Sequence, residues 1–175
     1  MALVSMIVAI GNQRQIGSSQ KPGLLWRVNE DLKLFKEFTK NSTLIVGRKT
    51  FETLPKSMIC SENRKFRVIT KSLLLPNHSN VSTSPSIKDA IQSSQGERIV
   101  IIGGGQIYKE SLSNLEILPL IDIIAVSEID TNNEGDIFFP EIPSCFTALD
   151  TEYFPSSTPN GLRWKFTVFS RNLNI

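Results

Sequence analysis

Five short apolar runs recur along the chain, and each of them ends at a glycine or at polar residues. They are rich in β-branched side chains, and they are shorter than helices of ordinary length. The pattern therefore predicts strands that are buried on both faces of a sheet. The five runs span residues 4–10, 43–46, 66–69, 98–102 and 122–127.

The segments between these runs carry apolar residues three and four positions apart, which is the spacing of one helix face. An alternation of strands and helices is typical of an α/β fold with a mostly parallel sheet. The positions that indicate the helices are Leu32, Phe35 and Phe38, then Phe51 and Leu54, then Ile87, Ala90 and Ile91, and finally Tyr108 and Leu112.

The C-terminal part of the chain has a different period. Apolar and polar residues alternate from Leu162 to Val168, after a turn-rich stretch at 155–161. This alternation predicts an antiparallel hairpin whose first strand lies near 146–154. A length of 175 residues without a linker or repeat favours one domain over residues 1–175, built on a mixed sheet.

Asp31 interrupts the apolar face of the first predicted helix. With Asn29 as the N-cap and about 100° between successive residues, Asp31 falls on the face of Leu34 and Phe35. An acidic residue in a first helical turn commonly serves the helix dipole. A carboxylate among apolar side chains is costly, however, so we expect a raised pKa and a role in binding a cationic or amidine-like ligand edge.

Three of the predicted strand ends suit an anion, because ligands of open α/β sheets collect at the carboxyl ends of strands. Residues 47–50 place two cations at a helix start, and 70–72 combine two hydroxyls with an ammonium group. Residues 103–105 are glycines, which would let backbone N–H groups approach a pyrophosphate. Each turn alone has an ordinary alternative as a solvated or tightly packed loop. Together they predict a dinucleotide site, and the cations favour NADPH over NADH.

Composition narrows the expected partners and compartment. The net charge is +2, from 19 basic and 17 acidic residues spread along the chain, so we expect neither a nucleic acid nor a membrane as partner. The apolar run at 4–10 has no basic leader and is too short for a membrane span. Cys60 and Cys145 lie outside any CxxC pattern, and His78 is the lone histidine. We therefore expect no metal site and no disulfide framework, and a location in the reducing cytoplasm. Our expectation for the oligomeric state, which the sequence does not determine, is a monomer.

Five motifs occur in the order and spacing of one enzyme family. They are MIVA at 6–9 with Ile16-Gly17, Trp26 ahead of 31–35, VGRKTF at 46–51, IGGG at 102–105, and EGD at 134–136 before Phe139-Pro140. Each motif is weak alone, but the set is highly specific. Through these residues the chain resembles dihydrofolate reductase along nearly its full length.

The resemblance implies a central eight-stranded mixed sheet, mostly parallel, flanked by about four helices. It also implies reduction of 7,8-dihydrofolate to tetrahydrofolate by hydride from NADPH, a step of one-carbon metabolism and an antifolate target. Asp31 matches the active-site carboxylate, which would hydrogen-bond the pteridine 2-amino group and N3 and support protonation of N5 through a water. Trp26 would help to fix that water, and Ser127 would hydrogen-bond Asp31.

The resemblance further implies which residues line the two ligand sites. Those expected at the substrate are the backbone of Val8, Ala9 and Ile102, the apolar side chains Phe35 and Leu54, Arg64 at the glutamate α-carboxylate, and Tyr108. Those expected at the cofactor are Ala9, Ile16, Gly17, Leu24, Gly47, Arg48, Lys49, Thr50, Thr70, Lys71, Ser72, Ile102, Gly103, Gly104, Gly105, Gln106, Ile107 and Tyr108. Among these, Arg48, Thr70 and Lys71 would contact the 2′-phosphate, and the Gly103-Gly104 peptide is expected to be cis.

The chain departs from the family pattern at three places. Leu25 stands directly before Trp26, where the family usually has proline, so we expect a loop that is more flexible or differently closed. The stretch 55–63 is lengthened and leaves open whether Met58 or Ile59 lines the substrate tail. Gln106 stands where some members carry an arginine for the 2′-phosphate.

Two other functions share some of these features. A reductase of the same fold that acts on a riboflavin-pathway pyrimidine would keep the cofactor turns but lack the helix carboxylate, and Asp31 with Arg64 argues against it. A binding protein without turnover would also hold the ligands. The intact set of Asp31, Trp26 and Phe35 favours an enzyme.

Overall fold

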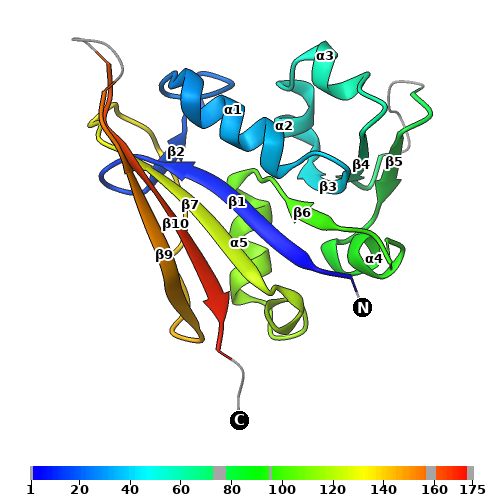
Figure 1. Cartoon of the computed structure of the whole chain (residues 1–175). Helices are drawn as coiled ribbons and strands as arrows, with labels where there is room; N and C mark the ends of the chain where they lie inside the picture. The colour runs from blue at the N-terminus through cyan, green and yellow to red at the C-terminus, as the bar shows by residue number, and fades with distance from the viewer. Residues whose placement is uncertain (1, 73–77, 95, 157–160, 173–175) are drawn as a thin grey trace.

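One mixed sheet of eight strands organises the protein (Figure 1). The computed structural model describes residues 2–72, 78–94, 96–156 and 161–172. The strands lie in the order β5-β4-β3-β6-β1-β7-β10-β9; neighbours from β5 to β7 are parallel, and β10 is antiparallel to both β7 and β9. Their bounds are β1 Val4–Ile10, β3 Ser42–Gly47, β4 Arg64–Ile69, β5 Val81–Ser84, β6 Ile99–Ile101, β7 Ile123–Ile129, β9 Phe146–Phe154 and β10 Trp164–Arg171.

This topology confirms the predicted α/β fold with a mostly parallel sheet and a C-terminal antiparallel hairpin. The hairpin turn at 155–161 lies partly outside the described residues, since 157–160 are not among them. A small separate ribbon pairs β2, Gln15–Gly17, with β8, Ile137–Phe138. These two strands and β5 carry no long apolar run, which explains why the hydrophobic pattern does not predict them.

Helices cover both faces of the sheet. One apolar cluster joins the sheet to α4, Ile87–Gln92, and to α5, Gly105–Ser113, followed by the short 3-10 helix η1, Leu118–Leu120. A second cluster joins the other face to α1, Asn29–Phe38, α2, Arg48–Glu52, and α3, Lys56–Ile59. In the described ranges, the single turn α3 and the 3-10 helix η1 are additions to the four predicted helices, and α3 lies in the lengthened stretch 55–63.

Strand β1 shows why its sequence is a continuous apolar run. Its residues Val4, Met6 and Val8 belong to the cluster of α4 and α5, whereas Ile7 belongs to the cluster of α1 and α2. Successive side chains of a strand point to opposite faces, so a central strand covered on both sides needs apolar residues at nearly every position.

The start of α1 differs from the prediction by one residue. Val28 occupies the N-cap position, and no side chain caps the helix there. Asn29, the predicted cap, is the first helical residue, and its Oδ1 accepts a hydrogen bond of 3.1 Å from Nε of Arg27. The facing of the helix is nevertheless as predicted, because Asp31 is its single buried residue.

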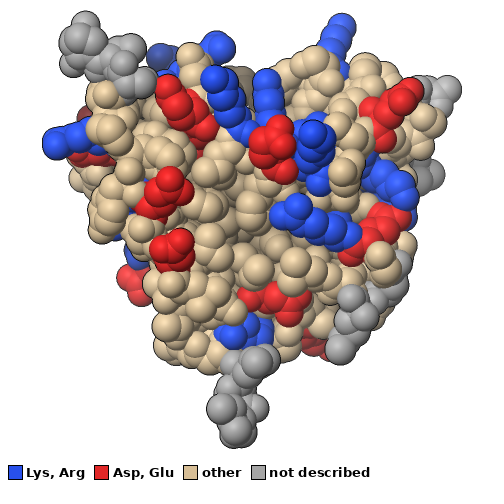
Figure 2. All heavy atoms as spheres, viewed as in Figure 1, with Lys and Arg blue, Asp and Glu red and all other residues tan. Residues whose placement is uncertain are grey.

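The surface shows mixed charge on the face seen in Figure 2, where basic and acidic side chains are interspersed. Within the described ranges, no helix combines the length and apolar character needed to cross a membrane. The same ranges hold no group of three or more His, Cys, Asp or Glu side chains placed to bind a metal ion.

We expect Ile101→Ala to lower the free energy of unfolding by about 2–5 kcal/mol, because Ile101 is 0% exposed in the centre of the sheet and its truncation leaves a cavity. Lys109→Ala, at an exposed position of α5, is the control and should change it by less than about 0.5 kcal/mol. Urea unfolding measures both, and an equally small effect of Ile101→Ala would contradict this view of the core.

Candidate active site

The carboxylate of Asp31 is enclosed between α1 and the sheet. Its residue is 8% exposed, and burial raises the pKa of Asp31 above its ordinary range, while a hydrogen bond with the side chain of Ser127 lowers it in part. Ser127 is buried in β7 and lies opposite Ala9 of β1 in the parallel register. The raised pKa and the contact between Asp31 and Ser127 are both as predicted.

The indole of Trp26 is buried a few residues before Asp31. It packs with Val28, Ile129 and Trp164, and its Nε1 has no hydrogen-bond partner in the part of the chain that the structure describes. A buried N–H donor without a partner is costly, so it is expected to bind a water or a ligand atom. The position of this donor fits the predicted role of Trp26 in holding a water.

The three glycines after β6 are packed too closely for any side chain. A Cβ on Gly104 would lie 2.5 Å from Oγ1 of Thr50, and one on Gly105 would lie 2.5 Å from Cγ2 of Ile137. Gly103 has a φ of 108°, and its peptide bond to Gly104 is cis, as predicted. Tight packing therefore accounts for these glycines by itself, and the close approach of backbone to a ligand is an additional use of the same turn.

Two of the predicted anion turns are joined directly. The N–H of Gly47, at the end of β3, donates a hydrogen bond of 2.7 Å to the carbonyl of Gly103. Helices α2 and α5 begin just after these two turns. The starts of the two helices therefore lie at one edge of the sheet, where their positive dipole ends favour an anion.

Cations stand at this edge without acidic neighbours in the first turn of α2. Arg48 pairs with Glu52 at 3.0 Å, but both side chains are about half exposed, so the pair contributes little stability and can give way to a ligand. Lys71 is exposed, and Oγ1 of Thr70 accepts a hydrogen bond of 3.0 Å from the N–H of Ser72. Lys49 and Gln106 are exposed as well.

Tyr108 fastens α5 to the central strand. Its hydroxyl donates a hydrogen bond of 2.7 Å to the carbonyl of Ile7, and its ring packs edge-on against Phe139 at 5.1 Å. Burial raises the pKa of Tyr108, so the phenol stays neutral. The structure thus gives Tyr108 a packing role, and its expected contacts with substrate and cofactor stay predictions.

Arg64 is a buried residue and not an isolated cation ahead of a strand. Its guanidinium donates to the carbonyl of Lys36 at 2.6 Å, to Oγ1 of Thr39 at 3.2 Å and to Oδ1 of Asn63 at 2.7 Å. Burial lowers the pKa of Arg64, and the nearby charge of Glu37 opposes that shift. These bonds hold the guanidinium at the C-terminal end of α1.

The predicted apolar contacts of the substrate lie in one cluster with the sheet. Phe35 and Leu54 are partly buried there, and Ile102 is buried beside them. Met58 and Ile59 both belong to the same cluster, so the choice between them stays open. Val8 is buried in β1, and Ala9 is half-buried.

The loop that carries Leu24 is tied to the segment 131–136. The N–H of Ser19 donates to Oδ1 of Asp136 at 2.7 Å, its hydroxyl donates to the same carboxylate, and both contacts lower the pKa of Asp136. Nδ2 of Asn133 donates to the carbonyl of Leu25 at 2.7 Å. Sequence reasoning did not single out Ser19 or Asn133, because polar loop residues leave no periodic signal. Ile16 and Gly17 lie in β2, and Leu24 is 59% exposed.

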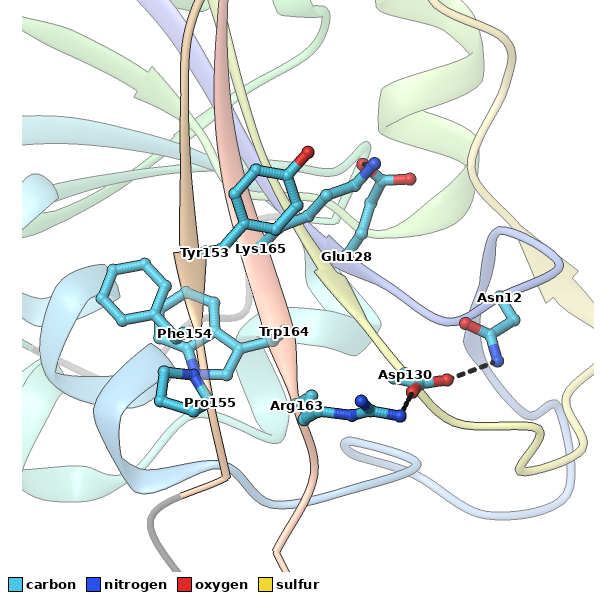
Figure 3. A pocket seen from close by; sticks show the side chains of 9 residues that line it. All are labelled: Asn12, Glu128, Asp130, Tyr153, Phe154, Pro155, Arg163, Trp164 and Lys165. Carbon is cyan, nitrogen blue, oxygen red and sulfur yellow. Dashed lines mark hydrogen bonds and ion pairs between the residues drawn. The ribbon is translucent and has the colours of Figure 1, made fainter.

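A separate hollow of about 500 Å³ lies on the C-terminal hairpin (Figure 3). Its four charged side chains pair with one another, Lys165 with Glu128 at 2.9 Å and Arg163 with Asp130 at 3.4 Å. None of the predicted site residues lines it. The lining residues are Asn12, Glu128, Asp130, Tyr153, Phe154, Pro155, Arg163, Trp164 and Lys165.

Comparisons with known proteins identify the family. A family model of dihydrofolate reductase matches residues 3–171. The type 1 dihydrofolate reductase of Escherichia coli is 38% identical over 156 residues, covering 88% of this chain and 92% of the relative. The dihydrofolate reductase of Buchnera aphidicola is 37% identical, covering 96% and 99%. A bifunctional dihydrofolate reductase-thymidylate synthase of Arabidopsis thaliana is 32% identical over 94% of this chain, which spans 34% of that longer relative.

The fold and these matches define an NADPH-dependent oxidoreductase. More particularly, the chain belongs to the dihydrofolate reductase family, and its reaction is the reduction of dihydrofolate in folate metabolism. This membership decides against the pyrimidine reductase of the same fold.

The buried carboxylate generates a prediction about stability. The pKa of Asp31 is higher in the folded than in the unfolded chain, so the folded state binds more protons between the two values, and stability falls as the pH rises through that window. We expect Asp31→Asn, which has no charge to bury, to be more stable than the unsubstituted protein at pH 7. At a pH below the pKa values of Asp31 in both the folded and the unfolded chain, the difference in stability between the two proteins should disappear. Urea unfolding against pH measures this, and a less stable Asp31→Asn protein at pH 7 would contradict the burial of a charge.

Proposed function

We propose that this protein reduces 7,8-dihydrofolate at the site around Asp31, with Asp31 supporting the protonation of substrate N5. The observation that carries this assignment is the buried Asp31 carboxylate, which is hydrogen-bonded to Ser127 and preceded by Trp26, whose buried indole N–H has no partner among the described residues. The reduction adds a hydride to C6 and a proton to N5 of the pterin. Asp31 and Trp26 serve the proton.

The raised pKa of Asp31 suits this role, because a carboxyl group that titrates nearer to neutrality exchanges a proton with a bound water more readily. The carboxylate also matches the 2-amino group and N3 of the pterin, which together present two donors to one acceptor group. Trp26 would hold the water with its free Nε1, and Ser127 would keep the carboxylate oriented. The three residues thus fix substrate and proton in one geometry.

The rest of the substrate would lie along the apolar cluster toward Arg64. The backbone of Val8, Ala9 and Ile102 borders the pterin, and Phe35 with Leu54 packs against its apolar parts. Arg64 would receive the glutamate α-carboxylate. Its bonds to Lys36, Thr39 and Asn63 already hold the guanidinium in place, so little side-chain entropy is lost on binding.

The residues at the joined turns fit NADPH. When bound, this group supplies the hydride. Its pyrophosphate would lie on the starts of α2 and α5, where the first turn of α2 carries Lys49 and no acidic residue. Arg48, Thr70, Lys71 and Ser72 would hold the 2′-phosphate. The remaining contacts would come from Ile16, Gly17, Leu24, Gly47, Thr50, Gly103, Gly104, Gly105, Gln106, Ile107 and Tyr108.

We propose further that residues 1–175 act as one domain, as a monomer, in the cytoplasm. A single domain is supported by the topology, in which β10 near the C-terminus pairs with β7, and β7 pairs with β1 near the N-terminus. Cys60 and Cys145 are free thiols, as a reducing compartment maintains them.

The catalytic assignment predicts the pH dependence of two variants. With NADPH and dihydrofolate, Asp31→Asn should lose about 100-fold or more of its turnover at pH 7, since a positioned acid contributes that much. Its NADPH affinity should stay unchanged, and its residual rate should rise steadily as the pH falls, because only solvent then protonates N5. Glu30→Gln, an exposed carboxylate of the same helix, is the matched control with an unchanged rate. The fall in NADPH absorbance measures turnover, and an Asp31→Asn rate equal to that of Glu30→Gln would remove Asp31 from its role.

The cofactor assignment predicts a selective loss in Arg48→Leu. Removing one charge-assisted contact should weaken NADPH binding by about tenfold or more while leaving the weaker NADH binding nearly constant, since NADH lacks the 2′-phosphate. Lys40→Leu, an exposed cation after α1, should change neither affinity. Fluorescence titration with both cofactors tests this, and an equal loss of both affinities would place Arg48 elsewhere.

A further inference from the structure

The chain segment before Trp26 has little regular structure of its own. Between β2 and α1 the chain forms neither helix nor strand over residues 18–28, and most of these residues are exposed. Yet the segment contains Trp26, a residue that is only 8% exposed. Its indole would have to be placed accurately to hold a water. Contacts from outside the segment are therefore needed to position it.

Asn133 supplies one such contact at the peptide directly before Trp26. Its Nδ2 donates a hydrogen bond of 2.7 Å to the carbonyl of Leu25. The N–H of Asn133 donates to Oγ1 of Thr131 at 3.2 Å, and its carbonyl accepts from Nε2 of Gln15 at 3.0 Å. Asn133 is an exposed residue, but it is held at both ends of its own backbone, which places its side chain beside the carbonyl of Leu25.

The side-chain amide of Gln15 holds the backbone of Asn133 in place. Gln15 is 3% exposed, its Nε2 also reaches the carbonyl of Thr131 at 3.3 Å, and its Oε1 accepts from the N–H of Gln13 at 2.9 Å. A Cβ added to Gly11 would lie 2.4 Å from Nε2 of Gln15, so the amide fills its space completely. A buried and fully bonded amide of this kind fixes the two loops that it joins.

The close packing around Gly135 supports the same contact between the segment 131–136 and Leu25. A Cβ on Gly135 would lie 2.5 Å from the carbonyl oxygen of Gly17 and 2.7 Å from Cδ1 of Leu25. The segment 131–136 therefore packs directly against Gly17, at the end of β2, and against Leu25, directly before Trp26. Leu25 receives both a hydrogen bond and a packing contact from it.

We propose that Asn133 is a positioning residue, which fixes the Leu25-Trp26 peptide through its hydrogen bond to the carbonyl of Leu25. Proline restricts its own φ covalently, whereas leucine does not. In this chain the restriction comes from a hydrogen bond across space instead. The inference deepens the proposed function, because its consequence is the placement of the Trp26 indole beside Asp31.

The test is a double-substitution cycle with Leu25→Pro. Among the described residues the N–H of Leu25 donates no hydrogen bond, so proline removes no bond there. We expect Asn133→Ala to slow the single-turnover hydride-transfer step about tenfold, the equivalent of one hydrogen bond, with the KM for dihydrofolate within about twofold. Leu25→Pro alone should stay close to the unsubstituted rate, and Leu25→Pro with Asn133→Ala should recover most of the loss.

Asn132→Ala is the matched control, since Asn132 lies in the same loop and bonds Asn12 but not Leu25. Asn133→Asp removes the donor at nearly constant size and should resemble Asn133→Ala. Hydrogen exchange at the Trp26 amide reports the same positioning without turnover, and it should speed up in both Asn133 variants and slow again with Leu25→Pro. If the unsubstituted protein does not reduce dihydrofolate, the proposed function is refuted. Hydrogen exchange at the Trp26 amide still tests the positioning role of Asn133 in that case.

Three results would overturn the proposal. They are an unchanged rate and exchange in Asn133→Ala, an equal loss in Asn132→Ala, or a double variant that is no better than Asn133→Ala. The last outcome would show that Asn133 supports the fold of its own loop and does not act through Leu25.

Discussion

The buried carboxylate of Asp31 is the constraint around which the substrate half of the molecule is arranged. In an ordinary amphipathic helix the most buried residue is apolar, but in α1 it is this acid. A charge in that position is costly unless hydrogen bonds or a ligand compensate it. Ser127 supplies a bond from β7, and the pairing of β7 with β1 places Ser127 opposite Ala9. The centre of the sheet, where burial is deepest, is therefore where we place the reacting end of the proposed site.

A second constraint governs the part of the molecule where we propose that the cofactor binds. The turns after β3 and β6 are joined by the bond from Gly47 to Gly103, and the glycines leave no room for side chains. Tyr108, bonded to Ile7, ties α5 to β1. Strand β1 thus contacts α5 on the proposed cofactor side and β7, which carries Ser127, on the proposed substrate side. Because β1 is a rigid element, it sets the distance between the start of α5 and Asp31.

Sequence patterns predicted the features that depend on local geometry. The apolar runs predicted the long central strands, because those strands are covered on both faces, and a helical projection placed Asp31 on the buried face. The short elements α3, β2, β5 and β8 were missed, since two to four mixed residues carry no period. The burial of Arg64 and the junction of Gln15, Asn133 and Leu25 could not be predicted, because they depend on contacts between segments far apart in the chain. Leu25 accepts a hydrogen bond from Asn133, and the more flexible or differently closed loop expected from Leu25 stays a prediction.

The burial of the Asp31 carboxylate is tested most directly by following the carboxyl carbon of Asp31 by NMR as the pH is varied, in the folded protein. We expect a pKa above the ordinary range of an aspartic acid, and a further rise when Ser127→Ala removes the hydrogen bond that lowers it. A pKa of Asp31 at or below that range, or one that Ser127→Ala leaves unchanged, would contradict a carboxylate held between desolvation and Ser127.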